Sequence, residues 1–165
     1  MATEVRERVI RWENPFAALE RIKHMSGLEA MRGILEGTLP QPPYAQLLGV
    51  RISEVDEGRV VFEADPGEEH YNPMGVVHGG FAMSLLDFAL GSAVSTTLSA
   101  GSSYGTVDVH ARLLRPITKD TGTVRCEATV VSATRSIATS EGRIIDRNGR
   151  ILATGTTACA IKILS

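Results

Sequence analysis

The chain has 165 residues, 43% of them hydrophobic and 22% charged, with a formal net charge of −2 at pH 7. This length supports one domain with a single core, and the composition is that of a globular protein. The small net charge, without any block of Lys and Arg, argues against nucleic acid as a partner.

The sequence also indicates in which cellular compartment the protein lies. The first residues are too charged for a signal peptide, and the longest uncharged run, residues 88–107, is too rich in Ser, Thr and Gly to span a membrane. Cys126 and Cys159 lack CxxC spacing and lie in strand-like runs, which favours reduced thiols in the core. We therefore expect a cytoplasmic protein without a membrane partner.

The first part of the chain has helical signals. A helix start is predicted at Pro15, and Ser26 with Glu29 three positions later is the capping-box pattern of a second helix. Glycines and prolines then break the chain. We interpret residues 1–43 as an N-terminal helical extension and residues 44–165 as the main domain.

The main domain alternates between strand and helix patterns. Glycine-containing turns near residues 57–58 and 146–149 are strong hairpin signals. The expected elements are a helical turn at 45–48, strands at 49–55 and 59–64, a long helix at 79–98, and strands at 103–115, 121–134, 137–146 and 150–163. This order predicts an α+β fold in which one antiparallel sheet wraps around one long central helix.

The stretch around that helix carries the chemistry. The helix is apolar on nearly every side, which predicts burial, yet Asp87 lies near its middle. A buried carboxylate without an obvious partner is costly, so Asp87 is a candidate nucleophile or general base. Gly79 and Gly80 open the helix, where unpaired N–H groups can hold an oxyanion, and His78 precedes them, placed to orient the turn.

Helix geometry separates these two features. Gly79 and Asp87 are eight residues apart, or about 12 Å along a helix. Asp87 therefore cannot attack a carbonyl held at the start of its own helix. This spacing predicts a two-fold dimer with antiparallel helices, in which each active site is shared between two chains.

The pattern Asn72-x-x-Gly75-x-x-His78-Gly79-Gly80, followed by Asp87, resembles that of hotdog-fold acyl-CoA thioesterases of the phenylacetate-pathway (PaaI-like) type. The likeness covers residues 44–163. It implies a hotdog fold, a dimer of hotdog dimers, and hydrolysis of a coenzyme A thioester with no metal or other cofactor.

The resemblance also implies roles for single residues. Asp87 matches the nucleophile or the base that activates water, and Gly79 matches the residue whose N–H binds the thioester oxygen. His78 supports that loop, Asn72 matches the residue that holds the attacking water or the carboxylate, and Thr106 matches a hydroxyl that helps to place the water.

Coenzyme A contacts follow from the same resemblance. Arg112 and Arg115 on one segment, and Arg135 with Ser136 in a turn, match places where relatives grip the nucleotide end, and cationic side chains suit its phosphates. Gly80 is expected beside the substrate.

Other interpretations stay open at this point. Asp87 could be a structural carboxylate paired with an arginine, His78 could only cap the turn, and Thr106 could be an ordinary strand residue. The spacing of the histidines and Asp87 matches no metal-binding pattern. An enoyl-CoA hydratase of the same fold is disfavoured because no Asp precedes Asn72, and a non-catalytic acyl-CoA-binding domain would not need Asp87. The acyl group and the choice between dimer and tetramer are undetermined.

Overall fold

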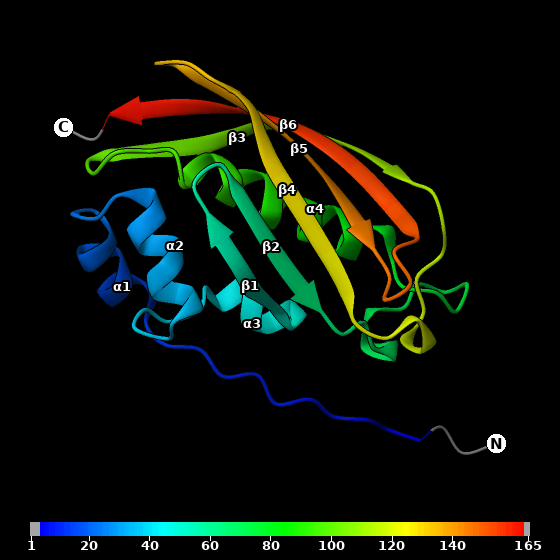
Figure 1. The fold of residues 1–165 in the computed structure, drawn as a ribbon. Coiled ribbons are helices and arrows are strands. Elements are labelled where there is room, and N and C mark those ends of the chain that lie inside the picture. The colour runs from blue at the N-terminus through cyan, green and yellow to red at the C-terminus, as the bar shows by residue number, and fades with distance from the viewer. Residues whose placement is uncertain (1–3, 164–165) are drawn as a thin grey trace.

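The computed structural model describes residues 4–163. A six-stranded antiparallel sheet in the order β1-β2-β4-β5-β6-β3 curves around helix α4, with α1 to α3 at one side (Figure 1). The elements are α1 Pro15–Ile22, α2 Gly27–Leu35, α3 Pro43–Leu48, β1 Val50–Asp56, β2 Arg59–Ala64, α4 Gly79–Ser95, β3 Ser102–Leu113, β4 Val124–Ala133, β5 Ile137–Ile145 and β6 Ile151–Ile163, with 3-10 turns η1 Glu68–His70 and η2 Lys119–Thr121. The predicted α+β hotdog architecture is confirmed.

Local sequence signals explain where the elements begin and turn. Ser26 accepts a hydrogen bond from the Glu29 N–H, and the Glu29 carboxylate accepts from the Ser26 N–H, so the capping box is present. Gly58 and Gly149 have φ values of 73° and 75°, a left-handed conformation that glycine adopts without strain, and they turn the β1–β2 and β5–β6 hairpins.

Helix α4 ends three residues earlier than expected, at Ser95. The hydroxyl of Thr96 donates to the Ala93 carbonyl and accepts a hydrogen bond from the Gly58 N–H. The Leu98 carbonyl accepts from the Gly27 N–H at the start of α2. The polar groups at this end of α4 thus bond to the Thr96 side chain and to other parts of the fold, and these bonds replace a further helical turn.

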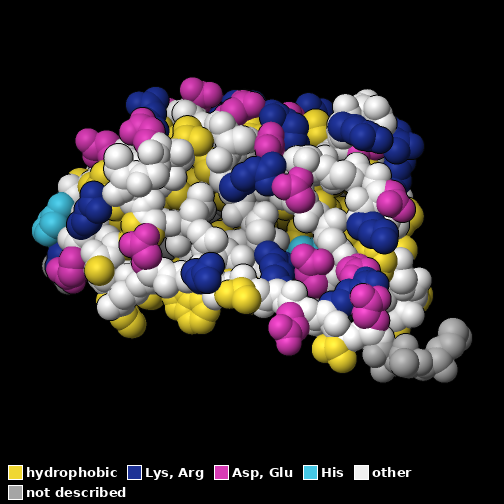
Figure 2. All heavy atoms as spheres, turned by 90° about the horizontal axis from the view of Figure 1, so that it is seen from below, with side chains coloured by type: hydrophobic (Ala, Val, Ile, Leu, Met, Phe, Trp, Pro, Cys, Tyr) yellow, Lys and Arg dark blue, Asp and Glu magenta, His cyan; other side chains and the backbone are white. Residues whose placement is uncertain are grey.

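The core lies between α4 and the concave face of the sheet. Leu85, Leu86, Ala89 and Leu90 of α4 are fully buried. The N-terminal helices join this core unevenly, because α2 and α3 contribute buried side chains whereas α1 has none. The face of the molecule seen from below carries basic and acidic side chains near one another, with hydrophobic side chains between them (Figure 2). A methyl group on Gly27 would lie 1.7 Å from the Ser95 carbonyl oxygen, so α2 and α4 meet backbone to backbone.

One face of α4 is not covered. Asp87 and Met83 are exposed, and Met83 retains 45% of its accessible surface. The expectation of a helix buried on all sides, with a buried carboxylate, is therefore wrong for the single chain, because the sheet curls around only part of the helix. The neighbouring edge strand β3 also exposes 66% of Val107. None of the helices within residues 4–163 is long and apolar enough to cross a membrane.

An ion-pair network on β1, β2 and β4 gives the fold a pH dependence. Arg125 binds Glu54 at 2.7 Å and Glu63 at 3.1 Å, and Arg59 binds Glu54 at 2.8 Å. Hydrogen bonds from Arg125 and then Arg59 hold the pKa of the Glu54 carboxyl below its ordinary value. Because this pKa is lower in the folded state, its stabilising contribution is present at neutral pH and is lost as the pH falls through the folded-state pKa.

Replacing the central arginine should remove this contribution. Arg125→Met is expected to lower the free energy of unfolding by about 1 kcal/mol at pH 7, because an exposed network is worth little more. At pH 3 the parent and the variant should differ less, since lowering the pH moves the Glu54 carboxyl toward its protonated form, which Arg125 no longer attracts. Urea unfolding at both pH values measures the two differences, and an equal difference at both would contradict the argument.

Candidate active site

Asp87 and Thr106 meet on the open face of α4. The Thr106 hydroxyl donates a hydrogen bond to Asp87 Oδ1 at 3.0 Å. The register between β3 and β6 shifts between Thr106 and Asp108, where the strand bulges. This bond leaves the second oxygen of Asp87 free to face a ligand. The structure therefore brings together two residues that lie 19 positions apart in the sequence.

The first two N–H groups of α4, those of Gly79 and Gly80, differ in their hydrogen bonding. His78 is the N-cap, and its Nδ1 accepts a hydrogen bond from the Gly80 N–H at 2.9 Å. The Gly79 N–H forms no hydrogen bond with any other residue in the range 4–163. Gly79, rather than Gly80, therefore offers its N–H to a ligand, and His78 serves the turn as its cap.

Asn72 shapes the loop that leads to this turn. Its side-chain oxygen accepts from the Met74 N–H at 2.9 Å, and its own N–H donates to the Val76 carbonyl at 2.8 Å. Gly75, with a φ of 76°, completes the tight turn. The side-chain oxygen of Asn72 is thus engaged within the loop, while its side chain still lines the adjacent pocket.

A pocket of about 280 Å³ lies at the start of α4. Its lining includes Asn72, His78, Gly79, Leu113 and Arg115. Leu113 lies directly over Gly79, since a methyl group on Gly79 would come 2.7 Å from Leu113 Cδ1. The Arg115 guanidinium donates to the Ile151 carbonyl at the rim. A carbonyl group entering this pocket would meet the unpaired Gly79 N–H.

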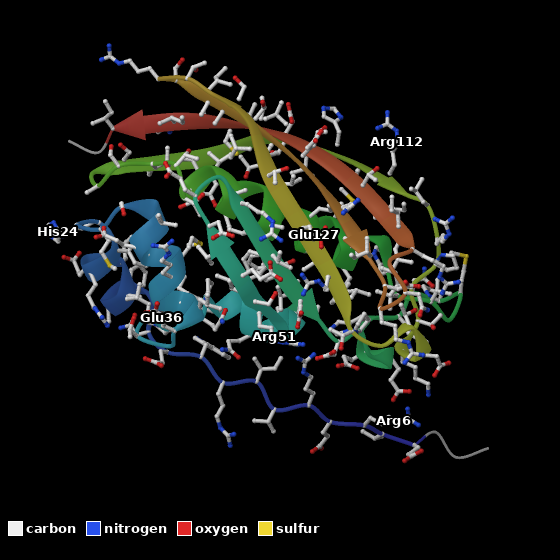
Figure 3. All side chains as sticks on the ribbon, viewed as in Figure 1. Arg6, His24, Glu36, Arg51, Arg112 and Glu127 are labelled. Atoms are coloured by element: carbon white, nitrogen blue, oxygen red, sulfur yellow. The ribbon has the colours of Figure 1, made fainter. Side chains whose placement is uncertain are left out.

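The residues expected to bind coenzyme A lie in three places. Arg115 lines the pocket at the start of α4, whereas Arg112 projects outward from the sheet (Figure 3) and lines a separate groove with Glu127 and Arg143. Arg135 and Ser136 form the β4–β5 turn, where the Ser136 carbonyl accepts from the Ile161 N–H. Arg112 and Arg115 therefore do not act at one site of the single chain.

Tyr104 lies beside α4 near Asp87, but the sequence motif does not include it. Its ring packs against Gly91, one turn of α4 beyond Asp87, where a methyl group would lie 2.9 Å from the Tyr104 hydroxyl oxygen. Burial raises the pKa of the Tyr104 phenol, and the charges of Cys159 and Asp87 add to the shift. The available signal was strand alternation, because Tyr104 lies two residues before Thr106 on β3.

Within residues 4–163, no three His, Cys, Asp or Glu side chains come close enough together to hold a metal ion. The groups that the site presents are the Asp87 carboxylate, the Thr106 hydroxyl and the Gly79 N–H. These are the groups that acyl transfer from a polarised carbonyl requires.

Comparison with known families agrees with this chemistry. Residues 74–153, which include His78, Gly79, Asp87 and Thr106, match the sequence profile of the thioesterase superfamily. This segment is similar to the thioesterase superfamily. Together with the fold, this similarity supports a thioester hydrolase. The matched part of the chain comprises α4, β3 to β5 and the beginning of β6.

Individual proteins that are similar to this chain agree with the profile match. The 1,4-dihydroxy-2-naphthoyl-CoA hydrolase of Listeria monocytogenes serotype 1/2a (strain 10403S) is 22% identical over 117 residues, which are 71% of this chain and 94% of the relative. A phenylacetic acid degradation-related protein of Ralstonia eutropha JMP134 is 29% identical with a TM-score of 0.72, over 79% of this chain and 98% of that one.

A further solved structure shares the fold. The PaaI protein of the E. coli phenylacetic acid degradation operon superposes with a TM-score of 0.72, over 87% of this chain and 99% of that one, at 20% identity. The PaaI-like relationship that the sequence motif predicts is supported by the Ralstonia protein at 29% identity, and by the E. coli protein at the level of the fold.

Proposed function

We propose that the protein hydrolyses an acyl-CoA thioester to a carboxylic acid and free coenzyme A, in a site shared by two chains. One observation carries the proposal. The Gly79 N–H, which has no partner within residues 4–163, and the Asp87–Thr106 pair are the groups that thioester hydrolysis needs, yet about 12 Å of α4 separates them within a chain.

A two-fold dimer unites the two parts. Met83 lies midway between Gly79 and Asp87 and is 45% exposed, so an axis at Met83 places Gly79 of the partner subunit opposite Asp87. The edge strand β3 has an unpaired side and exposes Val107, and pairing it with a second β3 would cover both. The exposed face of α4 is then the centre of the interface.

The proposed reaction uses these groups in a fixed order. The thioester oxygen accepts a hydrogen bond from the Gly79 N–H of the partner subunit, which stabilises the oxyanion of the tetrahedral intermediate. Asp87 either adds to the carbonyl carbon or takes a proton from a water that adds there, while Thr106 holds its other oxygen. Collapse of the intermediate breaks the C–S bond, and the coenzyme A thiolate leaves and takes up a proton. When Asp87 is the nucleophile, this step leaves an anhydride between Asp87 and the acyl group, and water then hydrolyses the anhydride to release the acid and regenerate Asp87.

The remaining groups position the substrate. Arg135 and Ser136, at the end of the sheet where β3 begins, and Arg115 at the pocket are the proposed contacts for the phosphates of coenzyme A. The relatives named above concern dihydroxynaphthoyl-CoA and phenylacetic acid, which makes an aromatic acyl group the first choice for this enzyme. Two such dimers associating would give the dimer of dimers.

Thiol release tests the proposal. The parent protein should release free coenzyme A from at least one member of a panel of aromatic and aliphatic acyl-CoAs, faster than the uncatalysed rate, and without added metal. Aromatic members should give the highest kcat/KM. Tight binding with no turnover on any member would contradict hydrolysis and favour an acyl-CoA-binding protein.

A further inference from the structure

His70 is a titratable side chain that the proposed reaction does not use, and it contacts the turn of residues 78–80 that presents the Gly79 N–H. Its backbone carbonyl accepts a hydrogen bond from the His78 N–H at 2.7 Å. Its imidazole ring packs on Phe81, in the first turn of α4, with the ring centroids 4.5 Å apart. Among residues 4–163, those that line the pocket at the start of α4 do not include His70. An effect of His70 on the reaction therefore passes through this turn.

The chain between His70 and His78 forms a small hairpin. Tyr71 and Val77 form an antiparallel bridge within it. The bond between the His78 N–H and the His70 carbonyl closes the hairpin at its base. Because Gly79 follows directly after this bond, a displacement of His70 also displaces the Gly79 N–H.

The neutral form of the His70 ring fits its surroundings. Nδ1 accepts a hydrogen bond from the Gly67 N–H at 3.0 Å, which assigns the ring proton to Nε2. The Arg8 guanidinium lies 3.5 Å from Nε2, and Glu69 binds the same guanidinium at 3.1 Å. A protonated ring cannot accept from the Gly67 N–H, and its charge would face that of Arg8.

The charged groups around the ring oppose one another. Of the described residues, Arg8 faces the ring from the N-terminal segment and Glu69 from η1, while Phe81 of α4 is apolar. Burial holds the pKa of the His70 imidazole below its ordinary value, the Glu69 carboxylate opposes this shift, and the Arg8 charge adds to it. The ring is therefore neutral at pH 7 and takes up a proton in the acid range.

We propose that neutral His70 is a positioning residue, which holds the hairpin of residues 70–78 so that the Gly79 N–H faces the thioester oxygen, and that protonation of the ring displaces this donor. The inference rests on the proposed function, because it concerns the oxyanion donor of the same site. It also gives the N-terminal segment a role, since Arg8 disfavours the proton on the ring. A merely structural role of His70 would instead affect the activity equally at every pH.

Two substitutions of His70 separate these cases. In His70→Asn the side-chain oxygen can accept from the Gly67 N–H at any pH, whereas His70→Phe keeps a ring beside Phe81 but offers no acceptor. The kcat of the parent should fall as the pH drops below the ordinary histidine value of 6.5. His70→Asn should stay within about twofold of the parent at pH 7.5 and should lose this acid limb. His70→Phe should lose about tenfold in kcat at every pH, with KM nearly unchanged, because the oxyanion donor acts in the transition state.

His24→Asn is the matched control for the loss of one imidazole. His24 projects at the opposite end of the molecule from Arg6, which pairs with Glu68 of η1 (Figure 3). Its pH profile should follow that of the parent. An acid limb that persists in His70→Asn, or equal losses in His70→Asn and His70→Phe, would overturn the proposal.

Arg8→Met tests the contact from the N-terminal segment. The substitution removes a positive charge from beside the ring and leaves the Glu69 carboxylate there, so the pKa of His70 should rise. The acid limb of kcat should therefore move to higher pH. Arg6→Met, which removes the partner of Glu68, is the control and should leave the limb in place. An unmoved limb in Arg8→Met would contradict the role of Arg8.

NMR provides a test that does not need turnover. In the parent, the backbone amide signals of His78 and Gly79 should shift with the same midpoint as the His70 ring, which ¹³C-labelled histidine reports. In His70→Asn this step should vanish from both amides. If the parent hydrolyses no thioester, the proposed function fails while these titrations still decide whether the ring controls the turn. Amide signals that do not follow the His70 midpoint would refute the inference alone.

Discussion

Asp87→Asn is expected to lower kcat for acyl-CoA hydrolysis by about 10³-fold, with a smaller effect on KM. The amide cannot add to a carbonyl or accept a proton from water at neutral pH. It keeps the size of the carboxylate, and its oxygen can still accept the hydrogen bond from Thr106. Thiol release under saturating acyl-CoA, with the best substrate of the parent, measures the change.

A matched carboxylate on the neighbouring strand provides the control. Asp108 accepts a hydrogen bond from the Ala158 N–H, a contact that an asparagine oxygen can also make. Asp108→Asn should therefore keep nearly the full kcat. Circular dichroism and sedimentation of both variants check that the fold and the assembly are unchanged. More than about a tenth of the parent kcat in Asp87→Asn would exclude Asp87 as the nucleophile or base.

Gly79→Pro should remove the oxyanion donor while leaving α4 in place. Proline is well tolerated at the first position of a helix, and His78 already has the extended conformation, φ −60° and ψ 137°, that a residue before proline prefers. Because proline has no N–H, the variant should lose about 10²- to 10³-fold in kcat, as other enzymes do when one such donor is removed.

Gly79→Ala is the steric control for this loss. Both substitutions place a Cβ against the flexible end of Leu113, but only proline removes the N–H. Gly79→Ala should therefore retain most of the activity that Gly79→Pro loses. Equal losses in the two variants would assign the effect to packing and would remove Gly79 from the oxyanion site.

Mixing the two inactive variants tests whether the site is shared. In a heterodimer of Gly79→Pro and Asp87→Asn chains, one site combines an intact Gly79 with an intact Asp87, and the other carries both defects. Random reassociation of equal amounts should restore about a quarter of the parent activity. If each site belonged to a single chain, mixing would restore none.

Most of the fold was predictable because its signals are local. The capping box of Ser26 and Glu29 and the hairpin glycines Gly58 and Gly149 depend on residues a few positions apart, so the sequence places these boundaries correctly. The sequence pattern predicts the end of α4 three residues too late, because the Gly58 N–H and the start of α2, which lie far away in the sequence, bond to the residues that follow Ser95.

The candidate site, like the fold, could be predicted from the sequence only in part. The sequence by itself determined the motif and the separation of Gly79 from Asp87, because the rise of a helix converts residue number into distance. Only the tertiary structure decided that His78 accepts from the Gly80 N–H, that the Gly79 N–H has no partner within residues 4–163, and that Asp87 lies on an open face.

Long-range contacts account for the rest. Arg112 and Arg115 are close in sequence yet line different cavities, since strand alternation and the end of β3 direct them apart. The Tyr44–Ser84 hydrogen bond joins residues 40 positions apart and depends on how α3 docks on α4. No local pattern encodes such contacts, because the packing of whole elements creates them.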